Sequence, residues 1–308
     1  MSELLSELRA ACAEVARRAR QVTLDLESIA PYAASLPSVC GPARPDPAEH
    51  LVGGTPEELT AFWLTLDAIN FGSGWFPTMR KRSGHSGYAT VAAGVRERFR
   101  AHGPWSAAEL ARIEAAEVAA ALGQDSDHEL MQLFAASLRD LGAHVAGDYN
   151  GHFAAVVQRA GSSAVTLVST LAGWSCFEDI SRYDGISLSF LKRAQIAAAD
   201  MSAAGVAPFE DVDRLTMFAD NLVPHVLRLD GVLRFAPELV ERIERGELID
   251  HGCGAEVEIR ACAVHAVELI AAARTDLAAA SIDRLLWQRG QLPRYKSRPR
   301  HRSRCTAY

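Results

Sequence analysis

An isolated carboxylate in an apolar stretch is the first candidate for chemistry in this sequence. Asp220 lies within residues 215–224, which read L-T-M-F-A-D-N-L-V-P. The apolar residues recur at helical spacing and predict a core-facing helix, kinked by Pro224, whose ring removes one backbone N–H donor. A carboxylate in such surroundings is costly unless a cation or a hydrogen-bond donor meets it. A helix cap or a satisfied core aspartate is the structural explanation, and a carboxylate placed to stabilise or attack positive charge is the functional one.

Four further segments accompany this motif. They are D-A-I-N-F at residues 67–71, S-L-S-F-L-K-R-A-Q-I-A-A-A-D at 187–200, E-V-E-I-R-A-C-A-V-H-A-V-E-L-I at 256–270 and H-R-S-R-C-T-A-Y at 301–308. Together with L-T-M-F-A-D-x-x-V-P-x-V-L, and in this order, they resemble the queuosine salvage protein family, the queuosine 5′-phosphate N-glycosylases. The resemblance spans residues 48–308 and is densest from residue 187 onward.

The resemblance implies hydrolysis of the N-glycosidic bond of queuosine 5′-phosphate, or of a related 7-deazaguanine nucleoside 5′-monophosphate, to the free base queuine and ribose 5-phosphate. Positive charge develops on the ribose in such a reaction, and a pre-placed carboxylate stabilises or attacks it. The family motif gives this catalytic role to Asp220. It also places Phe218 against the flat base. Carboxylate, water and binding groups suffice for this chemistry, so no cofactor is expected.

Two more residues are candidates for contacting the base. His50 lies just before a helix start, where the family places a base-contacting histidine, and its two ring nitrogens offer one donor and one acceptor. Asp283 matches a family aspartate suited to the cationic amine of queuine. The chain departs from the family beside it, with Arg284 in place of a tyrosine and Gln288 in place of a second aspartate. These changes leave open which base is preferred, and whether Asp283 merely lies on a solvated helix face.

A 5′-phosphate requires cations, and Lys192 is the first candidate for that role. Arg260 interrupts an apolar helix and is expected to have a buried partner, of which Glu256, one turn earlier, is the simplest. Seven Lys or Arg and no acid lie between residues 289 and 304. This basic tail could fold back over the site. Alternatively, it could bind nucleic acid, and the chain would then be a non-catalytic nucleic-acid-binding helical module.

The overall composition excludes several classes of protein. At 308 residues, with 49% hydrophobic residues and a net charge of -6, the chain has enough apolar residues for a large core, and its acidic balance argues against general nucleic-acid binding. For that reason no stable nucleic-acid partner is expected. No membrane association is expected either, because no apolar run approaches the length of a membrane span. The six cysteines are scattered without metal-ligand spacing, which predicts reduced thiols in a cytoplasmic protein and no metal site.

Helical patterns dominate the chain and predict an all-α bundle, which the resemblance likens to DNA glycosylases. Capping boxes at Thr55–Glu58 and Ser106–Glu109 predict two helix starts, the second helix running to about residue 122. Further helices are expected at 2–20, 127–145, 151–171, 187–204, 210–229, 237–245, 255–274 and 276–289. Residues 36–47 are expected to be extended, and 72–87 irregular or one short β-hairpin. The chain is expected to form a single domain, 1–308, whose parts 1–150 and 151–308 pack as two lobes around the site.

Overall fold

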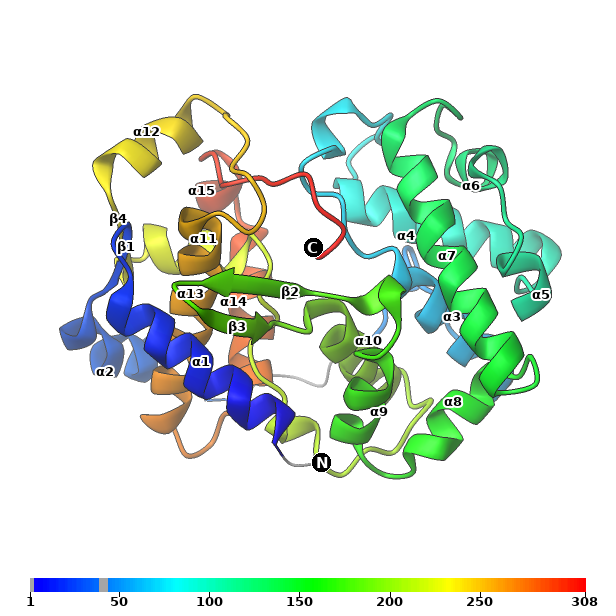
Figure 1. Cartoon of the computed structure of the whole chain (residues 1–308), viewed down its shortest axis with the longest axis horizontal. Coiled ribbons are helices and arrows are strands. Elements are labelled where there is room, and N and C mark those ends of the chain that lie inside the picture. Colours follow the sequence, from blue (N-terminus) through cyan, green and yellow to red (C-terminus); the bar gives the residue numbers. More distant parts are fainter. Residues whose placement is uncertain (1–2, 39–43) are drawn as a thin grey trace.

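The computed structural model describes residues 3–38 and 44–308, and this part of the chain is mainly helical (Figure 1). Part of the extended stretch expected at residues 36–47 therefore lies outside the described residues. The expected all-α class is confirmed, because the described residues form fifteen α-helices and only two two-stranded sheets. No described helix combines the length and the apolar character needed to cross a bilayer.

The α-helices are α1 Leu4–Arg18, α2 Leu26–Ser35, α3 Pro56–Ala68, α4 Gly87–His102, α5 Ala107–Leu110, α6 Ala115–Leu122, α7 Glu129–Asp148, α8 Phe153–Ala160, α9 Ala164–Leu171, α10 Lys192–Ala203, α11 Val223–Leu229, α12 Pro237–Glu244, α13 Gly254–Ala272, α14 Ala279–Gly290 and α15 Pro293–Lys296. The short 3₁₀ helices are η1 Phe76–Thr78, η2 Ser175–Phe177 and η3 Val212–Arg214. The strands are β1 Val22–Leu24, β2 Ile180–Tyr183, β3 Ile186–Ser189 and β4 Leu233–Phe235.

Two groups of helices lie on either side of a central region (Figure 1). In one group α13 is the core helix, and α1, α2, α11 and α14 pack around it. In the other, α3 packs against α7, α8 and α10. The N-terminal α1 thus belongs beside helices of the C-terminal half. The division into lobes at about residue 150 stays a prediction.

The β-structure consists of two antiparallel pairs, and the sequence patterns did not indicate either. Strands β2 and β3 form a tight hairpin in which Tyr183 pairs with Ile186, with Asp184 and Gly185 at positive φ in the turn. Strands β1 and β4 join distant parts of the chain through the pairing of Thr23 with Arg234. Residues 72–87, where a hairpin was one expectation, are irregular around η1.

Helix boundaries follow local capping chemistry. Both predicted capping boxes are present, with Thr55 accepting from the N–H of Glu58 at 3.2 Å and Ser106 from that of Glu109 at 3.2 Å. The helix expected at 151–171 is wrong as a single element. Gly161, at φ +62°, ends α8, and a new cap at Ser163 begins α9. The helix expected from 106 to 122 is likewise two elements, α5 and α6.

Candidate active site

The segment that carries Asp220 is not the helix that its apolar pattern predicts. Residues 215–220 are irregular, and α11 begins only at Val223, with Pro224 in its first turn, where a missing N–H costs nothing. The expectation of a kinked helix over residues 215–224 was therefore wrong. The segment leaves the helical conformation because buried side chains from other elements take up its backbone polar groups.

Three such side chains hold this segment. Gln195 on α10 accepts from the Thr216 N–H at 2.9 Å. Asp283 on α14 accepts from the Phe218 N–H at 3.0 Å. Arg260 on α13 donates from Nε to the Ala219 carbonyl at 2.8 Å. All three side chains are buried, so these bonds form away from competing water.

The Asp220 side chain uses one oxygen to begin α11. Its Oδ1 accepts from the backbone N–H of Leu222 at 2.8 Å and of Val223 at 3.1 Å. Within the described residues, Oδ2 accepts no hydrogen bond. The side chain is half-buried. One oxygen therefore holds the two N–H groups at the start of α11, as a helix cap would, and the second oxygen has no hydrogen-bond partner among the described residues.

Asp283 and Phe218 lie directly beside this carboxylate. Asp283 is 5% exposed, so it is not on a solvated helix face. Burial, and then the charge of Asp220, raise the pKa of Asp283 well above its usual range, and the Phe218 N–H opposes the shift. The Phe218 ring is half-buried. An approaching cation would relieve the repulsion between the two carboxylates.

Lys192, the first residue of α10, lies among carboxylates. Its Nζ donates to the Asn70 carbonyl at 2.8 Å and to Asn70 Oδ1 at 3.2 Å. Its backbone N–H donates to Asp179 at 3.1 Å. Burial lowers the pKa of Lys192 to about 8, and the nearby carboxylates, with Asp220 first, oppose this shift. The ammonium group therefore acts as a counter-ion within the site.

A second pair of acids adjoins Lys192. Asp67, at the end of α3, is fully buried, and its Oδ2 has no hydrogen-bond partner among the described residues. Burial, then Asp200, raise the pKa of Asp67 well above its usual range. Burial likewise raises the pKa of Asp200 to about 7, and Lys192 opposes it. Two neighbouring carboxyls whose pKa values are raised in this way hold a proton near neutral pH.

His50 connects to these acids through Tyr88. Its Nδ1 accepts from the Asp46 N–H at 2.9 Å, which assigns the proton to Nε2, 3.0 Å from the Tyr88 hydroxyl. Burial lowers the pKa of His50 to about 4. Its ring lies 5.0 Å from that of Trp63. The pKa of Tyr88 is raised by burial and then by Asp200 and other acids, so His50 forms one edge of the same cluster.

Arg260 is the buried centre of a network beneath Asp220. It pairs with Asp179 at 2.7 Å and, as expected, with Glu256, at 3.5 Å. Its guanidinium lies 4.0 Å from the ring centroid of Phe190 and 4.6 Å from that of Tyr308. Charge pairing raises the pKa of Arg260 beyond its already high value. The network fixes the Ala219 carbonyl, and with it the backbone that presents Asp220.

The end of the chain, residues 296–308, runs between the two groups of helices, and we call it the C-terminal strap (Figure 1). The His301 carbonyl accepts from Asn221 Nδ2 at 3.1 Å. The Tyr308 carbonyl accepts from the Gly72 N–H at 3.1 Å. The expectation that the basic tail folds back is thus confirmed, and the strap contacts the residue directly after Asp220.

The family model described as "Queuosine salvage protein" matches residues 51–308. The chain belongs to the queuosine salvage protein family. A relative from Sphaerobacter thermophilus is 35% identical over 265 residues, 82% of each chain. One from Bos taurus is 32% identical, over 70% of this chain and 68% of the relative, and one from Dictyostelium discoideum is 31% identical, over 82% and 79%. All three carry the name queuosine 5′-phosphate N-glycosylase/hydrolase.

Within this family member, the structure brings four of the five candidates together directly and connects the fifth, His50, to them indirectly. Asp220, Phe218, Asp283 and Lys192 lie around one another, and His50 joins them through Tyr88. The sequence analysis assigned no role to the pair Asp67 and Asp200 or to Tyr88. Asp67 begins one segment that carries the resemblance and Asp200 ends another, whereas no motif in the sequence indicates a role for Tyr88.

The described residues offer little for a metal. No three His, Cys, Asp or Glu side chains among them are grouped to hold an ion. The five cysteines that the structure describes are free thiols, four of them buried. Burial raises the pKa of Cys262 to about 12, so this thiol stays protonated and is a packing residue.

Proposed function

We propose that this chain hydrolyses the N-glycosidic bond of queuosine 5′-phosphate, or of a related 7-deazaguanine nucleoside 5′-monophosphate, to the free base and ribose 5-phosphate. The observation that carries the proposal is the geometry of Asp220, with one oxygen fixed by two backbone N–H groups and the other without a partner in the described chain. The names of the relatives, which include N-glycosylase/hydrolase, support the same reaction class.

The reaction breaks the bond between ribose C1′ and the base nitrogen, and the base leaves with the electron pair. Oδ2 of Asp220 either stabilises the resulting positive charge or bonds to C1′ and is then displaced by water. The water oxygen becomes the C1′ hydroxyl, and one water proton goes to the departing base. Asp200, whose pKa burial raises to about 7, lies in the same cluster and is suited to carry that proton.

The base would lie between Phe218 and Asp283. A flat heterocycle gains contact area and stacking energy against the half-buried Phe218 ring. The cationic amine of queuine would favour the ionised form of Asp283, offsetting the burial that raises its pKa. We also propose that the base replaces the Tyr88 hydroxyl as the partner of His50 Nε2. Lys192, the first candidate for the 5′-phosphate in the sequence analysis, lies among carboxylates that would repel a dianion, so we propose that it contacts the ribose instead.

The nucleic-acid-binding module remains the second candidate, and the geometry of the strap disfavours it. Several of its cations are used within the chain. Arg302 donates to the Gly246 carbonyl at 3.1 Å, and Arg298 pairs with Glu244 at 3.1 Å. We further propose a cytoplasmic protein without a cofactor or a stable macromolecular partner, in line with the free thiols.

The test is incubation of the purified chain with queuosine 5′-phosphate, followed by chromatography for free queuine and ribose 5-phosphate. Equimolar release of both products is the expected result. Failure to release base from this or any other 7-deazaguanine nucleotide, together with salt-sensitive DNA binding, would replace the enzyme with the nucleic-acid-binding module.

A further inference from the structure

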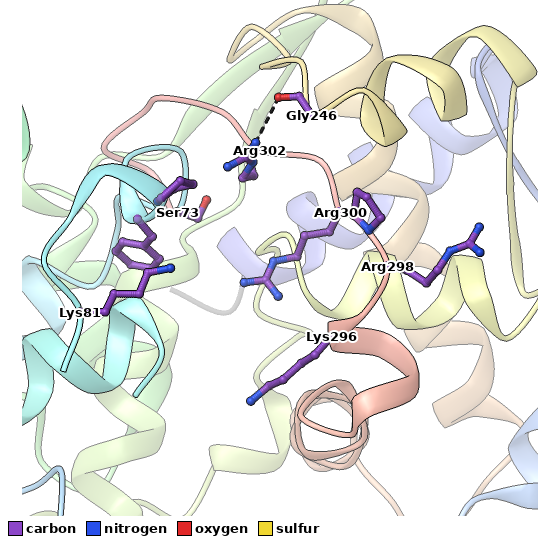
Figure 2. A pocket seen from close by; sticks show the side chains of 10 residues that line it. Ser73, Lys81, Gly246, Lys296, Arg298, Arg300 and Arg302 are labelled. Carbon is purple, nitrogen blue, oxygen red and sulfur yellow. Dashed lines mark hydrogen bonds between the residues drawn. The ribbon is translucent and has the colours of Figure 1, made fainter. Parts of the chain in front are cut away.

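Tyr308, in the C-terminal strap, is buried between the two groups of helices. Upstream in the strap, Arg302 donates to the Gly246 carbonyl at 3.1 Å, beside a cavity that Figure 2 shows from close by. Tyr308 itself is only 3% exposed, and it packs with the buried Cys305 and Ala307. This part of the strap therefore belongs to the interior of the chain.

The ring of Tyr308 lies against the buried guanidinium of Arg260, with 4.6 Å between the ring centroid and Cζ. Phe190 supplies a second ring, whose centroid is 4.0 Å from Cζ. The attraction between a cation and an aromatic face is stronger when both are shielded from water, as they are here. Nη1 of Arg260 has no hydrogen-bond partner among the described residues. This end of the guanidinium therefore depends on the two rings and on the charge of Glu256, 3.5 Å away.

Arg260 in turn holds the backbone at both charged groups of the site. Its Nε donates to the carbonyl of Ala219, directly before Asp220, at 2.8 Å. Its Nη2 donates to both carboxylate oxygens of Asp179, at 2.9 and 2.7 Å. Asp179 also accepts from the backbone N–H of Lys192 at 3.1 Å. A shift of the guanidinium would therefore disturb the backbone of Asp220 and that of Lys192.

The backbone of Tyr308 reaches a second support of the site. Its carbonyl accepts from the Gly72 N–H at 3.1 Å. Gly72 has a φ of +106°, and a Cβ there would come within 2.7 Å of Leu130 Cδ1, so this loop is packed closely against α7. Two residues earlier, Asn70 accepts from Lys192 Nζ through its carbonyl at 2.8 Å and through Oδ1 at 3.2 Å. Tyr308 thus also contacts the loop that holds the ammonium group.

We propose that Tyr308 is a positioning residue for the reaction. It fixes the carboxylate of Asp220 relative to the ammonium group of Lys192, and it does so through its neighbours without touching the substrate. A common support matters because a displacement of about 1 Å can lower a rate by about 10²-fold. The inference rests on the proposed function. The Tyr308 hydroxyl has no part in this role, because it donates to Ser303 Oγ, at 3.0 Å, within the strap itself.

The test compares Tyr308→Leu and Tyr308→Phe with a matched control, Tyr149→Leu. Tyr149, at the end of α7, is 4% exposed and also lies against an arginine, with Arg159 Cζ 4.1 Å from its ring centroid. Tyr308→Leu should lower kcat for release of base from queuosine 5′-phosphate by about 10- to 100-fold, with a change in KM of less than about threefold. Tyr308→Phe keeps the ring and should retain at least about half of the parent kcat. Tyr149→Leu should change kcat by less than about twofold. Equal losses of kcat in Tyr308→Leu and Tyr149→Leu, or an unchanged kcat in Tyr308→Leu, would overturn the proposal.

A double-mutant cycle decides whether Tyr308 acts through Asp220. In an Asp220→Asn background the reacting charge is absent, so Tyr308→Leu should lower the remaining kcat by less than about threefold. A further loss as large as that in the parent chain would refute the positioning role. Where Tyr308→Leu fails to fold, a ring-fluorinated phenylalanine at position 308 keeps the size of the ring and weakens its attraction to Arg260. Its kcat should be below that of Tyr308→Phe, and an equal kcat would also refute the role.

Hydrogen exchange separates this proposal from the proposed function. Segment 216–223 contains four backbone N–H groups that donate to side chains, those of Thr216, Phe218, Leu222 and Val223. If the parent chain releases no base, the proposed function fails, and exchange of this segment then decides the role of Tyr308. Exchange at least about tenfold faster in Tyr308→Leu than in the parent, without such a change in Tyr149→Leu, would support the positioning role. Equal exchange in Tyr308→Leu and in the parent would contradict it.

Discussion

Replacing Asp220 by Asn separates the two uses of this side chain. Its Oδ1 caps α11 by accepting from the N–H of Leu222 and Val223, and an amide oxygen preserves both bonds. The amide nitrogen replaces Oδ2 and removes the negative charge. Asp220→Asn therefore deletes the charge while the start of α11 stays intact. Asp220→Ala removes the charge and also the two hydrogen bonds at the start of α11. It should therefore in addition lower the free energy of unfolding by about 0.5–2 kcal/mol, as the loss of a helix cap does.

The size of the effect follows from the electrostatics of a half-buried site. Unit charges about 4 Å apart interact by about 4 kcal/mol at an effective dielectric constant of about 20. Loss of this stabilisation from the charged transition state corresponds to a decrease of about 10³-fold in kcat. Lys192 and Asp283 shape the same field, so a range of about 10²–10⁴ is expected.

The assay is single-turnover release of base from queuosine 5′-phosphate, with thermal melting to monitor folding. Asp211→Asn is the matched control, because Asp211 also accepts a backbone N–H at a helix start, that of Ala164 at 2.5 Å, where no base-contacting residue is proposed. It should leave kcat within about twofold of the parent value. A folded Asp220→Asn variant that keeps more than about a tenth of the parent kcat would show that Asp220 is only a helix cap.

Three other variants test the surroundings. Arg260→Met should lower the free energy of unfolding by about 3–5 kcal/mol, because it leaves Asp179 buried and unpaired; a loss below about 1 kcal/mol in urea titration would contradict this. Between pH about 4 and about 7 the folded chain keeps a proton on Asp200 that the unfolded chain has lost, so stability falls as pH rises through this window. Asp200→Asn removes that fall, and its gain in Tm over the parent should be larger at pH 8 than at pH 5; an equal gain would refute the shift. Arg284→Tyr with Gln288→Asp should increase the preference for queuosine 5′-phosphate over nucleotides with simpler bases, and an unchanged ratio of kcat/KM would place both residues outside the base site.

Local patterns were sufficient for several helices, such as α1, α7, α12 and α13, but they did not indicate α2 or α4. The capping boxes at Thr55 and Ser106 are present, because they depend on side chains three residues apart. The same local logic failed over residues 215–222, where apolar spacing predicted a helix. The decisive interactions there come from Gln195, Arg260 and Asp283, which are distant in sequence, and they override the local preference.

The candidate site was predictable only through the resemblance. Asp220 and Lys192 lie in motifs that carry it, yet nothing in the sequence indicates that Lys192 would lie among carboxylates. The raised pKa values of Asp67 and Asp200 arise from burial and from a contact between α3 and α10, and spacing along the chain carries no information about either. The contact between the strap and the Asp220 loop, through Asn221 and the His301 carbonyl, is likewise not indicated by the run of seven basic residues near the end of the chain.

The Asp220 loop is held by one contact before Asp220 and by one after it. On the base side, Asp283 accepts from the N–H of Phe218, two residues before Asp220. On the other side, Asn221, one residue after Asp220, donates to the His301 carbonyl of the strap. Binding of the substrate at its base and at its 5′-phosphate would hold ribose C1′ against the unpartnered oxygen of Asp220. Contacts remote from the bond being broken would then contribute to the rate and not only to affinity. On this argument, a substrate without its phosphate should lose kcat as well as affinity.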